Sequence, residues 1–248
     1  MPVRPEEVLD RIRSLGFSGP DAELLADHFL DAERRGKTGH GLARVEWLAT
    51  LPDLDPAARP ELVSAAPGFE HWDGRGTLGY LTLAAICAHL VADPPWPAKV
   101  VTAAHCFPTG MLGYWVRWLA EAGLAALLTA TSPPRLAHPG GGAALVGTIP
   151  LAIGIPSSGG DPIVADVSMA KATYGAVLAG EAAPEELVPF GADQAHKSFA
   201  LALGLQLLVQ AAAGADGYGA FLVALAPEFD PVPDLRARAA GLRLPGDS

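Results

Sequence analysis

The chain has 248 residues, half of them hydrophobic, so it can bury a large core as one large domain or two small interlocked ones. Its 27 acidic residues outnumber its 17 lysines and arginines, which gives a formal charge of −10 at pH 7. This balance argues against nucleic-acid or anionic-membrane partners, because both require clustered basic residues.

The first helices are predicted within residues 1–70. Val8, Ile12 and Leu15 mark one helix, and apolar residues at helical spacing predict a second over residues 21–35, with Gly36 as its stop. A third helix is predicted over residues 41–51. The prolines that follow keep residues 52–67 irregular.

After residue 70 the pattern becomes mixed. We predict a buried helix over 77–91, strands over 99–104, 124–131, 145–155 and 161–167, a long helix over 197–212 and a strand over 220–225. This order predicts an α/β protein with a mixed sheet covered by helices. Three regions follow: a helical region (1–70), a mixed-sheet core (71–226) and a short tail (227–248).

The ends and the cysteines indicate where the protein works. Residues 1–7 lack the apolar core of a signal peptide, and the longest apolar stretch, residues 199–213, is interrupted by Gln206 and Gln210. Cys87 and Cys106 are too few and too far apart for a disulfide framework or a zinc site. We expect a cytoplasmic location with both thiols reduced and no metal.

The most informative motif is the run Arg35-Gly36-Lys37-Thr38-Gly39-His40-Gly41-Leu42-Ala43-Arg44. His40 and Arg44 are four residues apart at a predicted helix start, so a proton donor and a carboxylate clamp can meet one small molecule there. The positive end of the helix dipole favours a neutral imidazole and an anionic ligand. The alternative is that His40 caps the helix and Arg44 makes a surface ion pair.

Several strand-end loops carry polar groups that a ligand site can use. They are residues 105–110, 129–133 and 147–150, with Lys171 beyond them. The chain has neither a G-x-G-x-x-G run between strand and helix nor a Walker loop. The motifs therefore leave the cofactor open.

Many short matches in order resemble the malate/L-lactate/ureidoglycolate dehydrogenase family, which includes sulfolactate dehydrogenases and piperideine-carboxylate reductases. The resemblance extends over residues 22–227. The matching residues are Arg35-Gly36, His40-Gly41, Arg44, Asp73-Gly74, Gly79, Gly110, Gly113-Tyr114, Thr131-Ser132-Pro133, Gly141-Gly142, Gly147-Thr148, Pro150, Pro162-Ile163-Val164, Asp166, Leu187 to Gly191 and His196-Lys197.

This resemblance implies a non-Rossmann, partly antiparallel sheet, NAD or NADP as cofactor, a small carboxylate substrate and a homodimer. It implies that His40 donates or accepts the substrate proton and that Arg44 holds the carboxylate. The residues implied to line the cofactor and substrate cleft are Thr131, Ser132, Gly147 and Thr148, with Lys197 near the cofactor phosphates or the active site. Each of three residues has a plainer reading: a turn hydroxyl for Thr148, a helix cap or turn acceptor for Asp166, and a solvated helix start for His196.

The chain also departs from the family pattern. Thr38-Gly39 replaces an Asp-Ser pair, which removes a hydroxyl near His40, and Pro108 stands where the family has a second histidine. His105 either substitutes for that histidine or points into the core. Lys197-Ser198-Phe199-Ala200 lacks two glycines of the family run, and segments are missing before residue 187 and after residue 229.

Three hypotheses follow. The first is an NAD(P)-dependent oxidoreductase that reduces a carboxylate-bearing ketone or cyclic imine. The second is a relative that no longer uses nicotinamide and catalyses a non-redox step such as imine formation, cyclisation or elimination in specialised metabolism. The third is a non-catalytic partner subunit. The retained His40 and Arg44 favour the first hypothesis.

Overall fold

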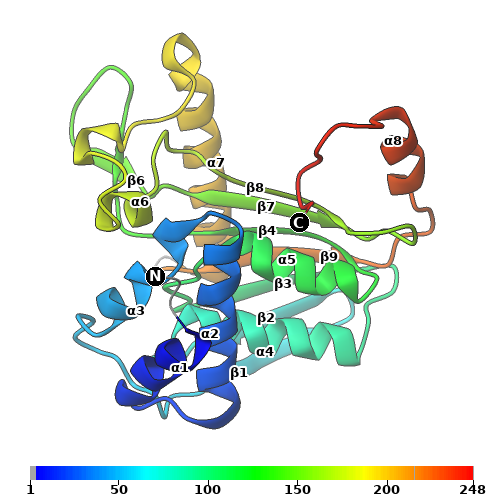
Figure 1. Ribbon diagram of the computed structural model, residues 1–248, viewed down its shortest axis with the longest axis horizontal. Coiled ribbons are helices and arrows are strands. Elements are labelled where there is room, and N and C mark those ends of the chain that lie inside the picture. The colour runs from blue at the N-terminus through cyan, green and yellow to red at the C-terminus, as the bar shows by residue number, and fades with distance from the viewer. Residues whose placement is uncertain (1–3, 215, 248) are drawn as a thin grey trace.

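The computed structural model describes residues 4–214 and 216–247 and is built around one seven-stranded sheet (Figure 1). The strand order is β1-β2-β3-β9-β4-β7-β8. Only β2 and β3 pair in parallel among these neighbours, so the predicted mixed, partly antiparallel sheet is confirmed. The strands are β1 (Glu61–Ala66), β2 (Phe69–Asp73), β3 (Ala98–Ala104), β4 (Ala125–Ala130), β7 (Pro150–Ile155), β8 (Ile163–Ser168) and β9 (Ala220–Leu225), with β5 (Leu136–Ala137) and β6 (Ala144–Val146) in a separate pair.

Helices cover both faces of the sheet. In Figure 1, α4 and α5 lie in front of it and α7 passes behind it. α5 packs on β4 and β7, whereas α7 packs on β3, β4 and β9. The α-helices are α1 (Pro5–Ser14), α2 (Gly19–Arg34), α3 (Ala43–Leu48), α4 (Gly79–Ala92), α5 (Leu112–Glu121), α6 (Tyr174–Leu178), α7 (Ala195–Ala213) and α8 (Val232–Arg238), and the 3-10 turns are η1 (Thr38–His40), η2 (Pro184–Glu186) and η3 (Ala192–Gln194). Within the described residues, no helix combines the length and apolarity needed to cross a membrane.

One apolar core joins the N-terminal helices to the sheet. Phe29 of α2, Tyr80 of α4, Trp115 of α5 and Leu128 of β4 are all fully buried in it. A smaller cluster connects α7 to the β5–β6 pair. The division at residues 70 and 226 stays a prediction, and residues 1–3 and 248 of the two end regions lie outside the described residues.

Most predicted elements of the core are confirmed. The helix predicted over 77–91 is α4, and the one over 197–212 is α7. The strands predicted over 99–104, 124–131, 161–167 and 220–225 are β3, β4, β8 and β9. Helix α5 was not predicted as a separate element, although its apolar residues recur at helical spacing.

The single strand predicted over 145–155 is wrong, because the chain breaks into β6 and β7 there. A Cβ on Gly147 would lie 2.4 Å from the Ser132 hydroxyl, so only glycine allows this close approach. Ile149 takes a left-handed backbone conformation, with φ 36°, and its side chain is fully buried. Thr148 therefore lies between the two strands, and it lines the same cavity as Thr131, which follows β4.

Two further predictions need correction at the N-terminal side. Residues 52–67 are not irregular throughout: β1 begins directly after Pro60, because a proline outside the ladder does not remove a strand hydrogen bond. The helix predicted over 41–51 is only α3. Gly41 has ψ −134°, which is not helical, so His40 lies in the separate turn η1.

The segment before β9 connects the loops that follow two other strands. Cys106, just after β3, donates its backbone N–H to the carbonyl of Tyr218 at 2.7 Å. Thr131, just after β4, donates its N–H to the Gly219 carbonyl at 2.9 Å, and the Gly219 N–H donates to the Thr131 hydroxyl at 2.8 Å. The position of one loop relative to the other therefore depends on residues 218–219.

Candidate functional site

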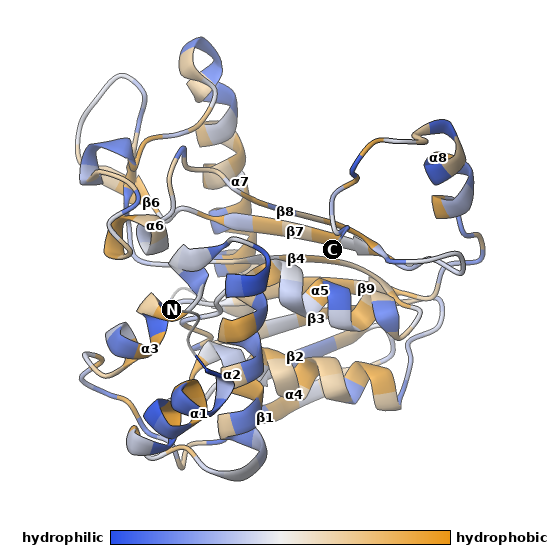
Figure 2. Ribbon diagram, in the orientation of Figure 1, coloured by the Kyte–Doolittle hydropathy of each residue, from blue (hydrophilic) through white to orange (hydrophobic). Residues whose placement is uncertain are grey.

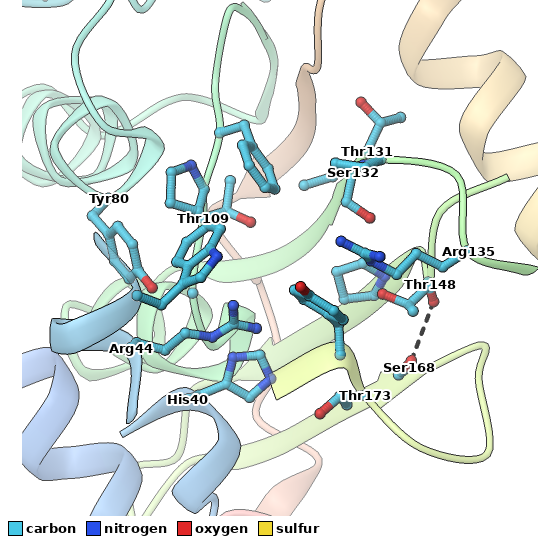
Figure 3. Close-up of a pocket in the computed structure, with 18 of the residues that line it drawn as sticks. His40, Arg44, Tyr80, Thr109, Thr131, Ser132, Arg135, Thr148, Ser168 and Thr173 are labelled. Carbon is cyan, nitrogen blue, oxygen red and sulfur yellow. Dashed lines mark hydrogen bonds between the residues drawn. The ribbon is translucent and has the colours of Figure 1, made fainter. Parts of the chain in front are cut away.

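A cavity of about 280 Å³ lies where η1 and α3 meet the loops after β3 and β4 (Figure 3). Strand-end loops are the usual place for ligand sites in sheets covered by helices. Among the described residues that line it, none carries a carboxylate. The lining residues are His40, Arg44, Trp47, Leu51, Tyr80, Phe107, Pro108, Thr109, Gly110, Ala130, Thr131, Ser132, Pro133, Arg135, Thr148, Pro150, Ser168, Thr173 and Tyr174.

His40 lies at the bottom of this cavity and is held there by a close backbone contact. A Cβ on Gly39 would lie 2.5 Å from the backbone nitrogen of Ala176, so η1 packs directly on α6 only with glycine here. This contact gives a structural reason for glycine at position 39, where the family pattern has serine. The His40 Nδ1 is buried without a hydrogen-bond partner among the described residues.

The electrostatic surroundings keep His40 neutral. Burial, followed by the positive charges of Arg44 and Lys37, lowers the pKa of His40 to about 4, although Asp166 acts in the opposite direction. At neutral pH the ring therefore has a lone pair free to accept a proton. A bound anion would offset the charge of Arg44 and raise this pKa.

Arg44 extends into the same cavity from α3. Its Nε donates to the Gly39 carbonyl at 3.0 Å, and its guanidinium carbon lies 4.9 Å from the centre of the Trp47 ring. Burial lowers the pKa of Arg44, and the neighbouring Arg135 lowers it further. Figure 3 shows its side chain in the cavity, and free guanidinium N–H groups are donors well suited to a carboxylate.

The loops implied to line the cleft reach this cavity in part. Thr131, Ser132 and Thr148 line it, and Figure 3 shows Thr131 and Ser132 on the side opposite His40. Gly147 is packed behind Ser132, and its N–H donates to the Gln206 side chain at 3.0 Å. The Ser168 hydroxyl donates to the backbone carbonyl of Thr148 at 3.2 Å. This hydrogen bond uses the backbone of Thr148 and not its hydroxyl.

His105 and Lys197 are not brought to His40. His105 has φ 50°, and its half-exposed ring bonds Asp73 at 2.9 Å, so it neither points into the core nor takes the place that Pro108 occupies. It lines a neighbouring cavity of about 270 Å³. Lys197 and His196 are exposed in the first turn of α7, outside the residues lining either cavity. The roles of His105 and Lys197 stay predictions.

Asp166 lies on the other side of His40. Its carboxylate accepts from Lys37 at 3.1 Å and from the backbone N–H of Gly113 at 3.0 Å. Gly113 is in the first turn of α5, so Asp166 caps that helix from β8, as its plainer interpretation predicts. Lys37, Asp166 and His40 together line a third cavity, of about 240 Å³.

Sequence reasoning missed several lining residues, notably Tyr80, Arg135 and Tyr174. The Tyr80 hydroxyl is buried without a described partner, and burial raises the pKa of Tyr80 to about 12. One signal was available for Arg135: it is the only Lys or Arg between Arg117 and Lys171, and it directly follows a Ser-Pro-Pro run.

A buried histidine behind the cavity was also missed. His28 accepts a hydrogen bond from the Met111 N–H at 3.1 Å and contacts the rings of Tyr80 and Trp115. Burial lowers the pKa of His28 to about 3. Gly110 passes directly over it: a Cβ there would lie 2.4 Å from the His28 Nε2, so a side chain does not fit at this edge of the cavity.

Comparison with known proteins supports a family assignment. The family model for malate/L-lactate dehydrogenase matches residues 6–191, three quarters of the chain. The chain belongs to this dehydrogenase family. The matched range includes η1, α3, β4 and α6, and thus every residue that lines the cavity at His40, but not α7 or β9.

The chain is also similar to curated dehydrogenases and reductases. A (2R)-3-sulfolactate dehydrogenase (NADP(+)) of Chromohalobacter salexigens is 32% identical over 186 residues, which is 70% of this chain and 54% of that protein. A Delta(1)-pyrroline-2-carboxylate/Delta(1)-piperideine-2-carboxylate reductase of Pseudomonas putida is 30% identical over 229 residues, 80% of this chain and 66% of that one. The chain thus spans about half to two thirds of these relatives.

Solved structures of the dehydrogenase family share the fold. A dehydrogenase from Sinorhizobium meliloti superposes with a TM-score of 0.84 at 23% identity, covering 100% of this chain and 90% of that one. A delta1-piperideine-2-carboxylate reductase from Pseudomonas syringae gives 0.81 at 23% identity, covering 100% and 91%. The non-Rossmann α/β fold that the resemblance implied is therefore confirmed.

Proposed function

We propose that the protein is an NAD(P)-dependent oxidoreductase that reduces a small carboxylate-bearing ketone or cyclic imine. The observation that supports this most directly is the meeting of His40 and Arg44 in one cavity whose described lining has no carboxylate. An acidic lining would repel an anionic substrate, and this lining does not. The names of the curated relatives support the same reaction class.

In this proposal Arg44 binds the substrate carboxylate and thereby places the carbonyl or imine beside His40. The bound anion compensates the Arg44 charge, so the imidazole takes up a proton more readily. His40 then donates that proton to the oxygen or nitrogen as the C=O or C=N bond is reduced. In the oxidation direction the neutral ring accepts the proton of the hydroxyl or amine.

The residues present are compatible with a nicotinamide cofactor only if the cofactor extends over two adjoining cavities. The cavity at His40 lies just below the usual volume of a small-molecule site, about 300–1,000 Å³. It shares Leu51, Phe107 and Pro108 with the neighbouring cavity at His105, which extends the available space. When bound, the cofactor supplies or accepts the hydride. The apolar walls suit the nicotinamide ring, and Thr131, Ser132 and Thr148 offer hydroxyl groups for its polar parts.

The first test is direct titration with NADH and NADPH, followed by nicotinamide fluorescence and by heat. Binding with a micromolar Kd, about −8 kcal/mol, is expected for one or both. Ser132→Phe fills the cavity and should abolish this binding, whereas Ser14→Phe, on the exposed end of α1, should leave it unchanged. Which of the two cofactors binds is also decided by this titration.

One observation favours a second candidate, a non-redox enzyme acting on a related carboxylate. The cavity at His40 alone is large enough for a small acid, and Pro108 offers no proton-transfer group where the family has a histidine. If the purified protein binds neither NADH nor NADPH, this candidate replaces the first.

We also propose that the protein is a homodimer and that a second copy covers α7. Four leucines of α7 are 40–55% exposed (Leu201, Leu203, Leu207 and Leu208), and Figure 2 shows apolar residues recurring along this helix. Exposed apolar surface of this kind marks an interface. A cytoplasmic location stays a prediction.

The dimer is tested with a double substitution on one face of α7. Leu201→Lys with Leu208→Lys adds two charges seven residues apart while keeping good helix formers, so we expect a monomer by light scattering at micromolar concentration. Leu242→Lys, at a side chain 70% exposed outside α7, should leave a dimer. A wild-type protein that is already monomeric would contradict the proposal.

A further inference from the structure

A second arginine faces the cavity across from Arg44. The Arg135 guanidinium carbon lies 3.4 Å from the centre of the Tyr174 ring, within the range of a stacked cation–π contact. Figure 3 shows Arg44 entering the cavity from the His40 side and Arg135 from the opposite side. Stacking on the ring fixes the plane of the guanidinium without using its N–H groups, which stay available to a ligand.

Arg44 and Arg135 share this ring. The Arg44 guanidinium carbon lies 5.9 Å from the same ring centre. The two guanidinium carbons can therefore be no farther apart than the sum of their distances from this ring centre. A short molecule with an anionic group at each end can span that separation.

The two positive charges have no compensating anion among the residues that the structure describes. Neither arginine forms an ion pair with a described carboxylate, and the described lining contains no Asp or Glu. Arg135 lowers the pKa of Arg44, which is the effect of two like charges facing one another. In a chain with a net charge of −10, carboxylates are abundant elsewhere, so their absence from this lining leaves room for anions of a ligand.

We propose that Arg135 binds a second anionic group of the substrate, so that the site selects a short-chain dianion. One carboxylate lies on Arg44, and a second carboxylate, or a sulfonate or phosphonate, lies on Arg135. The hydroxyl of Ser132, in the same loop as Arg135, is placed to donate to that second group. This inference rests on the proposed function only for the role of Arg44.

The test measures binding heats of unreactive acids to the purified protein. Succinate carries two carboxylates, and butyrate has the same chain length with one. We expect wild type to bind succinate about 10- to 100-fold more tightly than butyrate, as for one additional charge-assisted pair. Equal affinity, or no detectable binding of succinate at millimolar concentration, would overturn the proposal.

Substitutions at Arg135 assign the preference to this residue. Arg135→Met should remove the preference for succinate while leaving butyrate affinity within about twofold, and Arg135→Lys should retain part of it because the charge remains. Arg13→Met, which removes an exposed arginine on α1, should change neither affinity. Thermal unfolding of each variant verifies folding, and Arg135→Lys keeps the test valid if Arg135→Met is unstable.

A nicotinamide cofactor also carries anionic phosphates. A second experiment therefore distinguishes binding of a substrate anion from binding of a cofactor phosphate. The same variants are titrated with NADPH. If Arg135→Met weakens NADPH binding but keeps the preference for succinate, Arg135 serves the cofactor and the proposal is wrong. Because succinate and butyrate are not reduced, a protein that binds no nicotinamide still gives a decisive result on Arg135.

Discussion

Replacing His40 with glutamine is expected to lower turnover by about 10²- to 10⁴-fold, the usual contribution of a general acid–base group. Glutamine fills similar space and keeps polar atoms in the cavity, but it does not transfer a proton at neutral pH. The measurement is steady-state turnover with the best substrate from a screen of 2-oxo acids and cyclic imino acids. Cofactor affinity and circular dichroism should match the wild type.

The matched control is His138→Gln. This histidine is exposed and lines neither the cavity at His40 nor its neighbour, so we expect turnover within a few-fold of wild type. If His138→Gln lost as much turnover as His40→Gln, the loss would not be specific to His40. If His40→Gln kept full turnover, the acid–base role would be wrong.

The pH dependence of oxidation provides a second readout of the same variant. Oxidation requires the neutral ring, and the pKa of His40 is lowered to about 4 by burial and then by Arg44. Lowering the pH through this value protonates the ring and removes the proton acceptor. We therefore expect kcat/KM for oxidation to be level down to about pH 5 and to fall toward pH 4, a limb that His40→Gln should lack.

Replacing Arg44 with methionine is expected to weaken binding of carboxylate substrates by about 2–5 kcal/mol, which corresponds to a rise in KM of roughly 30- to several-thousand-fold. The effect is large because Arg44 is partly buried, and its hydrogen bond to the Gly39 carbonyl and its contact with the Trp47 ring hold it beside the proposed carboxylate position. The measurement compares KM for a carboxylate substrate with KM for its uncharged amide.

Only the carboxylate should lose affinity. A variant that weakened acid and amide alike would show that Arg44 shapes the cavity rather than binding the charge. Arg44→Met should also raise the pKa of His40, because it removes the largest charge that lowers this pKa. The acid limb of the oxidation profile should then move to higher pH.

The sequence predicted that His40 and Arg44 lie close together, and both line one cavity. They do not share a helix face as predicted, because His40 is in η1 and Arg44 is in α3. Helix α4 and strand β9 were predicted from local pattern, because most of their residues are apolar. The one local prediction that failed nearby, the helix over 41–51, failed because Gly41 leaves the helical region of backbone space.

The wall of the cavity formed by Arg135 and Tyr174 could not be predicted from local sequence patterns. Arg135 meets Tyr174 only because β6, β7 and β8 return the chain to the end of β4. Likewise, Gly39 looked like the loss of a useful hydroxyl, whereas its contact with α6 shows that a side chain does not fit. A single sequence carries no signal for contacts between segments so far apart.

The position of β9 means that the site can be completed only late in synthesis of the chain. β9 lies between β3 and β4, and residues 218–219 connect the loops that follow those two strands. Before this segment leaves the ribosome, β3 can pair with β2 and β4 with β7, but the strand that joins the two pairs is missing. The two halves of the cavity are then not held in register. A nascent chain that already carries His40, Arg44 and Arg135 therefore has no assembled site, and ligand capture begins only once the end of the sheet has been made.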